Sequence, residues 1–435
     1  MTQRLHLDEA RVAALALVVE IVREDNAVRY ATAIVDIYGR ISLAVWIGEE
    51  GIDSTLANRF ADACGEHWTG SVHLSVASHP ERDEDLLTRT AWLEGTPLDD
   101  ERARVTDRFR HHTAWRSSAG ARPLWSLEEG PPIIAFHGFK GGVGRTTLLA
   151  SYALACARRG EKISVVDVDL DAPGVGTLLA ADDIGTTSSW GTVDYLLESS
   201  APHPIEDYFH VVAREALTGS GQIEVTPAGQ LDDGYLPKLA RVDLEVRGRA
   251  EDHPLAKLLW ALRERSPARI LLDGRAGLSP AAGLLLSGLA HLHVLIATSN
   301  AQSLAGLERV VRHLGYDAAR QGLPQLECVV VQALVPEVVE AAQLAREAFS
   351  RRVEQIFRDG YYAKNSTEDD SIWSLDDMGS DFAPHVPVPI HYNAAFAHYA
   401  SIEDIADRLT TDPDLVALHA RFDERVGRVE EADLG

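Results

Sequence analysis

The chain has 435 residues, enough for two domains, and its 66 acidic against 41 basic side chains give a formal net charge of −25. This charge balance argues against sequence-independent binding of nucleic acid over the surface as a whole, because such binding depends on neutralising phosphates. The chain shows no signal-peptide pattern and no run of about 18 apolar residues, so we expect a cytoplasmic protein that does not enter a membrane.

The first 125 residues read as a small α+β module. Asp8 can cap a helix that runs to about Arg23, with apolar side chains on one face. Residues 30–48 alternate in polarity around a central turn and predict a β-hairpin, which a helix near 55–63 and a strand near 72–76 would follow. We therefore predict a first domain over residues 1–125, a candidate partner-binding module, and a second domain over residues 126–435.

A glycine-rich run opens the second domain. Residues 133–138 predict a short buried strand, and a helix is expected from Thr146 to about Arg159. Three glycines within four residues let the backbone point successive N–H groups inward, and the following helix adds the partial positive charge of its N-terminus. We predict that phosphate groups are bound here, and the alternative is a tight turn without a ligand. The residues of this predicted loop are Gly141, Gly142, Val143, Gly144, Arg145, Thr146 and Thr147.

Two later strands end in carboxylates. The strand over residues 163–169 ends in Asp167 and Asp169, which share one face because alternate side chains of a strand point the same way. The strand over 269–273 ends at Asp273. Each carboxylate alone fits a helix cap or a turn equally well. Together with the loop and the hydroxyl of Thr146, they predict a nucleotide site that uses Mg²⁺.

The run from Lys140 to Thr147 resembles the deviant Walker-A loop of the ParA/MinD family of ATPases, whose pattern is Lys-Gly-Gly-x-Gly-Lys-Thr-Thr. Lys140 matches the family's signature lysine, which reaches the phosphates of a second subunit in a nucleotide-sandwich dimer. The sequence departs from the pattern at Phe139, where the family has its first loop glycine, and at Arg145, where it has a second lysine. A subgroup of the family with a Lys-Gly-Gly-Val-Gly-Arg loop resembles this run more closely still.

The resemblance assigns roles to the other site residues. It implies that Asp169 positions the attacking water and that Asp167 lies near Mg²⁺. The segment from Asp273 to Gly277 resembles the family's Asp-x-x-x-Gly motif, with the aspartate in the outer shell of the metal and the glycine near the terminal phosphate. Arg275 stands where many members carry proline. By the same resemblance, Thr146 binds the metal, and Arg145 keeps a positive charge for the β- and γ-phosphates.

The resemblance covers roughly residues 130–410 and implies a doubly wound α/β fold with a mostly parallel sheet. Segments at 223–229 (a strand and a Pro-Ala-Gly turn) and 292–304 (a strand, a loop and a helix start), with strands at 327–331 and 387–390, fit the family's remaining order. The absence of a Cys-x-x-Cys pair argues against the iron–sulfur carrier branch. The acidic C-terminus lacks the basic amphipathic pattern that reversible membrane binding uses.

From these features we predict an ATP- and Mg²⁺-dependent switch. It would form a homodimer with ATP, hydrolyse ATP slowly through Lys140, Asp169 and Arg145, and report its nucleotide state to a protein partner. Two alternatives stay open: a nucleotide-binding scaffold with little turnover in a multiprotein system of defence or signalling, and a partition-type ATPase that binds DNA.

Overall fold

The computed structural model describes residues 7–48, 56–108, 125–127, 130–180, 190–244, 250–286, 288–321, 325–364 and 372–434. It divides the chain into two compact units, Met1–Thr113 and Ala114–Gly435. The predicted domain boundary at residue 125 adjoins residues 109–124, which lie outside the described residues, so that boundary stays a prediction. Within the described part of the chain, none of the helices combines the length and the apolar character that a membrane span requires.

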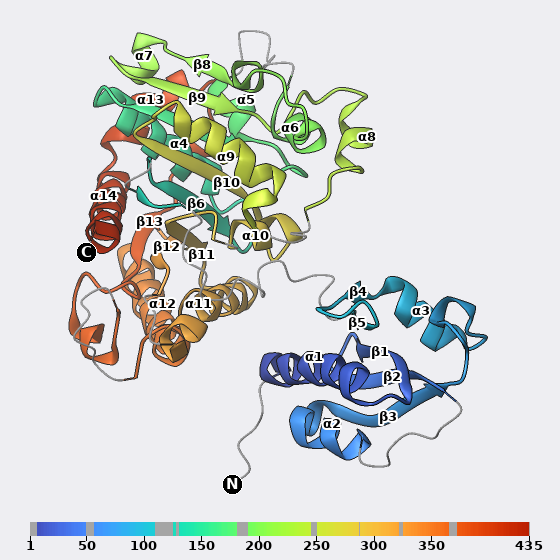
Figure 1. Cartoon of the computed structure of the whole chain (residues 1–435). Coiled ribbons are helices and arrows are strands. Elements are labelled where there is room, and N and C mark those ends of the chain that lie inside the picture. The colour runs from blue at the N-terminus through green and yellow to red at the C-terminus, as the bar shows by residue number, and fades with distance from the viewer. Residues whose placement is uncertain are drawn as a thin grey trace. The chain divides into compact units, whose positions relative to one another are not determined.

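The first unit is an α+β fold around a five-stranded sheet of order β3-β2-β1-β5-β4 (Figure 1). The predicted hairpin is confirmed, because β1 and β2 pair antiparallel. The helices α1 and α2 cover one face of the sheet, and Trp92 of α3 packs against Trp46 on the other. The elements are α1 (Leu7–Glu24), β1 (Val28–Val35), β2 (Ile41–Ile47), α2 (Leu56–Cys64), β3 (Trp68–Ser75), α3 (Leu86–Glu94), β4 (Thr96–Pro97) and β5 (Ala103–Asp107).

The second unit is built on an eight-stranded sheet of order β13-β12-β11-β6-β10-β7-β9-β8, in which every neighbouring pair is parallel except β8 and β9. This confirms the predicted mostly parallel α/β fold. The strands are β6 (Ile133–Gly138), β7 (Lys162–Asp167), β8 (His210–Val212), β9 (Gln222–Thr226), β10 (Arg269–Ala276), β11 (Leu292–Ala297), β12 (Glu327–Val335) and β13 (Val388–His391). The helices are α4 (Arg145–Arg158), α5 (Val175–Ala180), α6 (Thr192–Glu198), α7 (Glu215–Thr218), α8 (Tyr235–Leu239), α9 (Pro254–Glu264), α10 (Pro280–Leu285), α11 (Ala301–Gln321), α12 (Val339–Gly360), α13 (Glu403–Thr411) and α14 (Pro413–Leu434).

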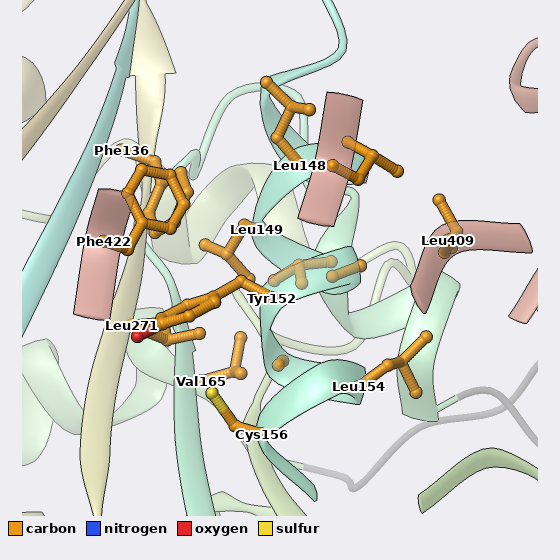
Figure 2. Packing of buried hydrophobic residues seen from close by; sticks show 14 of the residues in the cluster. Phe136, Leu148, Leu149, Tyr152, Leu154, Cys156, Val165, Leu271, Leu409 and Phe422 are labelled. Atoms are coloured by element: carbon orange, nitrogen blue, oxygen red, sulfur yellow. The ribbon is translucent and has the colours of Figure 1, made fainter. Parts of the chain in front are cut away.

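Helices cover both faces of this sheet, because its central strands are apolar on both sides. Along β6, Ile134 and Phe136 point into the core formed with α4, α5, α13 and α14, whereas Ile133 and Ala135 point into the core formed with α6, α9 and α10. Figure 2 shows the first of these cores, where Phe136 meets Phe422 of α14. This packing fixes α4, and with it the loop that joins β6 to α4.

A third core holds that loop from the side of α11. Phe139, at the position of the family's first loop glycine, is buried among residues such as Leu295 and Val310. Its ring lies against Gly306 in α11, where an added Cβ would come within 2.7 Å of Phe139 Cδ1. The glycine of the helix therefore makes the room that the loop phenylalanine occupies.

We predict that Gly306→Ala lowers the free energy of unfolding by about 1–2 kcal/mol, because overpacking against Phe139 outweighs the gain in helix propensity. Gly427→Ala is the matched control, since Gly427 also lies in a helix and an added Cβ there meets no atom within 4 Å. In the control, the free energy of unfolding should rise by up to about 1 kcal/mol. Urea-induced unfolding of both variants measures the difference, and equal shifts would contradict the packing argument.

Candidate functional site

The loop from Lys140 to Gly144 presents open backbone at the carboxyl end of β6. Gly142 and Gly144 have φ values of +73° and +83°, a left-handed conformation that favours glycine. A Cβ added at Gly141, Gly142 or Gly144 would meet no other atom within 4 Å, so the space beside the loop is free. Val143 is buried and anchors the loop, while the side chain of Lys140 is exposed. These features fit a backbone cradle for phosphate groups.

The strand order places the predicted carboxylates beside this loop. β10 lies between β6 and β7, and Asp273 is the register partner of both Phe136 and Asp167. All three aspartates, at 167, 169 and 273, are buried. Residues more than 100 positions apart in the sequence are thus collected at one edge of the sheet.

Arg145 bridges two of these carboxylates. Its Nε donates to Asp273 Oδ1 at 2.5 Å, and its Nη2 donates to Asp169 Oδ2 at 2.7 Å. Burial alone would lower the pKa of Arg145, but the adjacent Asp273 and Asp169 carboxylates raise it overall, so the guanidinium stays charged. From the sequence we expected Arg145 to contact the nucleotide phosphates, whereas in the structure it lies between the carboxylates of Asp169 and Asp273.

The remaining oxygen atoms of the site suit a magnesium ion. Thr146 Oγ1 donates to Asp273 Oδ2 at 2.8 Å, which places a hydroxyl beside a carboxylate. Burial, together with the nearby Asp273 carboxylate, raises the pKa of Asp167 to about 8. Among the described residues, no group of three or more His, Cys, Asp or Glu side chains is arranged to hold a metal alone. Mg²⁺ commonly takes one or two carboxylates together with substrate phosphates, so the residues present fit an ion that arrives with a nucleotide.

Backbone hydrogen bonds shape the segment after β7. Asp167 accepts from the N–H groups of Asp169 and Gly174, at 3.0 and 3.1 Å. The N–H of Gly277 donates to the carbonyl of Gly138 at 2.7 Å, which ties the end of β10 to the end of β6. Gly277, with φ of +85°, therefore lies next to the glycine-rich loop, as its predicted place near a phosphate requires.

The sequence alone did not single out three side chains near the site, those of His137, His293 and Tyr235. His137 of β6 and His293 of β11 have Nε2 and Nδ1 3.1 Å apart, and burial lowers the pKa of His137 to about 3, so this ring stays neutral. Arg275, which the sequence did single out, forms an ion pair with Asp171, just after Asp169. Tyr235 donates its hydroxyl to the carbonyl of Leu170 at 2.7 Å. A histidine inside an apolar strand was the available signal for the first pair, but Tyr235 lies in a polar segment without any motif.

Comparison with known proteins assigns this region to a family. Residues 134–349 match the model of the CobQ/CobB/MinD/ParA nucleotide-binding domain, a segment that runs from β6 into α12 and contains every predicted site residue. The chain carries a CobQ/CobB/MinD/ParA nucleotide-binding domain. This confirms the resemblance to ParA/MinD ATPases, whereas membership of the Lys-Gly-Gly-Val-Gly-Arg subgroup stays a prediction.

Curated relatives share a short segment with this chain. The iron-sulfur cluster carrier proteins of Salmonella typhimurium and Escherichia coli K12 are 43% and 40% identical to it over 60 residues, which is 14% of this chain. The chain matches only 16% of the length of those relatives. Its own three cysteines, at 64, 156 and 328, are buried.

Solved structures are also similar to this chain. The cell division ATPase MinD of Pyrococcus furiosus aligns with a TM-score of 0.40 and 19% identity, over 67% of this chain and 98% of that one. The septum site-determining protein MinD of Pyrococcus horikoshii, complexed with Mg-ADP, aligns with a TM-score of 0.41 and 17% identity, over 70% of this chain and 98% of that one. The pNOB8 ParA bound to nonspecific DNA aligns with a TM-score of 0.42 and 14% identity, over 68% of this chain and 99% of that one.

Arg145→Ala should lower the free energy of unfolding by about 3–5 kcal/mol, because it leaves Asp169 and Asp273 buried without a cation. Arg145→Lys should cost less, since the ammonium keeps the charge but does not reproduce the two-pronged geometry. The control is Arg358→Ala on the surface of α12, whose pair with Glu354 is worth at most about 0.5 kcal/mol. Urea-induced unfolding compares the three, and equal effects of the two alanine variants would show that the bridge contributes nothing.

Proposed function

We propose that this protein is an ATP-dependent switch that dimerises with Mg²⁺-ATP, hydrolyses ATP slowly and reports its nucleotide state to a protein partner. The observation that carries the proposal is the convergence of an open glycine loop, a helix N-terminus, the Thr146 hydroxyl and the carboxylates of Asp167, Asp169 and Asp273 at one edge of the sheet. Membership of the nucleotide-binding family supports it.

The residues of the site divide the work of binding. The N–H groups from Gly141 to Thr146 would donate to phosphate oxygens, and the N-terminus of α4 would add its partial positive charge. Thr146 and Asp273 would hold Mg²⁺, with Asp167 beside them, and the ion when bound neutralises charge on the phosphates. Asp169, two residues beyond the end of β7, would orient the attacking water.

Two cations remain, and they have different places. Lys140 is exposed on the loop, where its flexible ammonium is available to the phosphates of a second subunit. Arg145 is buried and forms ion pairs with Asp169 and Asp273. It can therefore bind the phosphates only after it breaks these ion pairs. This competition supports slow turnover, below about 1 s⁻¹, the lower end of ordinary enzyme rates.

The nature of the partner is a separate part of the proposal. The acidic net charge does not by itself exclude nucleic acid as a partner, because a local basic patch is enough to neutralise phosphates. We favour a protein partner and keep DNA as an outcome of the test. The whole activity of the iron–sulfur carrier relatives is not extended to this chain, because the match covers a small part of their length.

Lys140→Ala should abolish ATP-dependent dimerisation and reduce turnover on the order of 10²-fold, the usual cost of losing one group that stabilises developing phosphate charge. Binding of ATP to the single subunit should persist, because the backbone cradle is unchanged. Lys257→Ala, which removes an exposed lysine from α9, is the control and should behave as the wild type. Light scattering with and without Mg²⁺-ATP gives the mass, and phosphate release gives the rate.

Other outcomes of the same measurements separate the alternatives. Absence of binding to any nucleotide would overturn the proposal as a whole. Binding without phosphate release, together with unchanged cellular activity of Asp169→Ala, would favour the scaffold. A salt-sensitive interaction with DNA that requires ATP would favour the partition-type ATPase.

A further inference from the structure

Three consecutive residues after β7 are held by three different parts of the domain. The carboxylate of Asp169 is bound by Arg145 from α4, and the carboxylate of Asp171 pairs with Arg275 from β10. Between them, the carbonyl of Leu170 accepts a hydrogen bond from the hydroxyl of Tyr235 at 2.7 Å. The first two contacts belong to sequence motifs, whereas Tyr235 comes from the polar segment between β9 and α9.

Tyr235 is built into the interior, although it begins the short helix α8. Its side chain is 5% exposed and belongs to the core formed with α6 and α9. Its ring passes so close to Gly229 that an added Cβ there would lie 3.1 Å from Tyr235 Cε2. Burial raises the pKa of Tyr235 well above its ordinary value, so the hydroxyl stays protonated and donates a hydrogen bond to the Leu170 carbonyl.

The segment that carries Tyr235 is itself anchored. Lys238, one turn further along α8, pairs with Asp194 of α6 at 2.8 Å. Asp194 also accepts from the N–H of Gly191 at 3.0 Å, and Val193 donates its N–H to the carbonyl of Ala228 at 2.9 Å. The hydroxyl of Tyr235 therefore reaches Leu170 from a fixed support.

We propose that Tyr235 is a positioning residue for Asp169, acting through the Leu170 carbonyl; the assignment rests on the proposed role of Asp169 in hydrolysis. Fixing that carbonyl fixes the plane of the peptide that follows Leu170, and so limits how far the backbone next to Asp169 rotates. The orientation of a group that directs water is sensitive to such shifts, since a misplacement of about 1 Å costs up to 10²-fold in rate.

Tyr235→Phe removes only the hydroxyl and tests the assignment. We expect the kcat for ATP hydrolysis to fall about tenfold, the equivalent of one ordinary hydrogen bond, with less than about twofold change in KM. The melting temperature should change little. Amide exchange in the peptide that spans residues 170–174 should become faster.

Tyr208→Phe is the matched control. Tyr208 is buried in the same core, and its hydroxyl accepts from the N–H of His203 at 3.1 Å, away from the segment after β7. It should leave kcat and exchange at residues 170–174 unchanged.

The outcomes distinguish this inference from the function on which it rests. A wild-type protein that releases no phosphate would overturn the proposed hydrolysis. If the wild type hydrolyses ATP and Tyr235→Phe has the same kcat, the role proposed for Tyr235 is wrong, and the proposed function still stands. Equal losses in both variants, with lowered melting temperatures, would show that Tyr235 is a structural residue only.

Discussion

Three carboxylates buried at one edge of a parallel sheet are the constraint on which this domain depends. Asp167, Asp169 and Asp273 lie close together away from water, and such a group is tolerated only with a compensating cation or with retained protons. Arg145 supplies the cation here, through direct bonds to two of the three. Burial and the neighbouring Asp273 charge raise the pKa of the third, Asp167.

Under the proposed function, the same constraint would connect nucleotide binding to the conformation of the domain. Arg145, which neutralises the carboxylates and also stands at the predicted phosphate-binding position, would then have two sets of partners. Exchange between them would couple the arrival of Mg²⁺ and phosphates to the segment after β7. Arg275 and Tyr235 contact that segment as well, so changes there extend to β10 and to α8.

The packing around the glycine loop explains how the site keeps its shape. Helices on both faces of β6 hold the strand, and Phe139 fills the space that Gly306 leaves open in α11. The loop thereby has one buried anchor at Phe139 and a second at Val143, with exposed glycines between them. Rigid supports around an open backbone are what a phosphate cradle requires.

The resemblance to the ParA/MinD family implied the parallel sheet. Local spacing along the chain was sufficient to predict the strand-loop-helix around Lys140 and the strands that carry Asp167 and Asp273. These features depend on neighbours in the sequence, on alternation and on glycine, which a single sequence displays directly. The partners of Arg145 and Tyr235 were not predictable in this way. Arg145 meets Asp273 across 128 positions, and Tyr235 meets Leu170 across 65. Which side chain fills a given space is decided by strand order and core packing, and only the tertiary structure determines these.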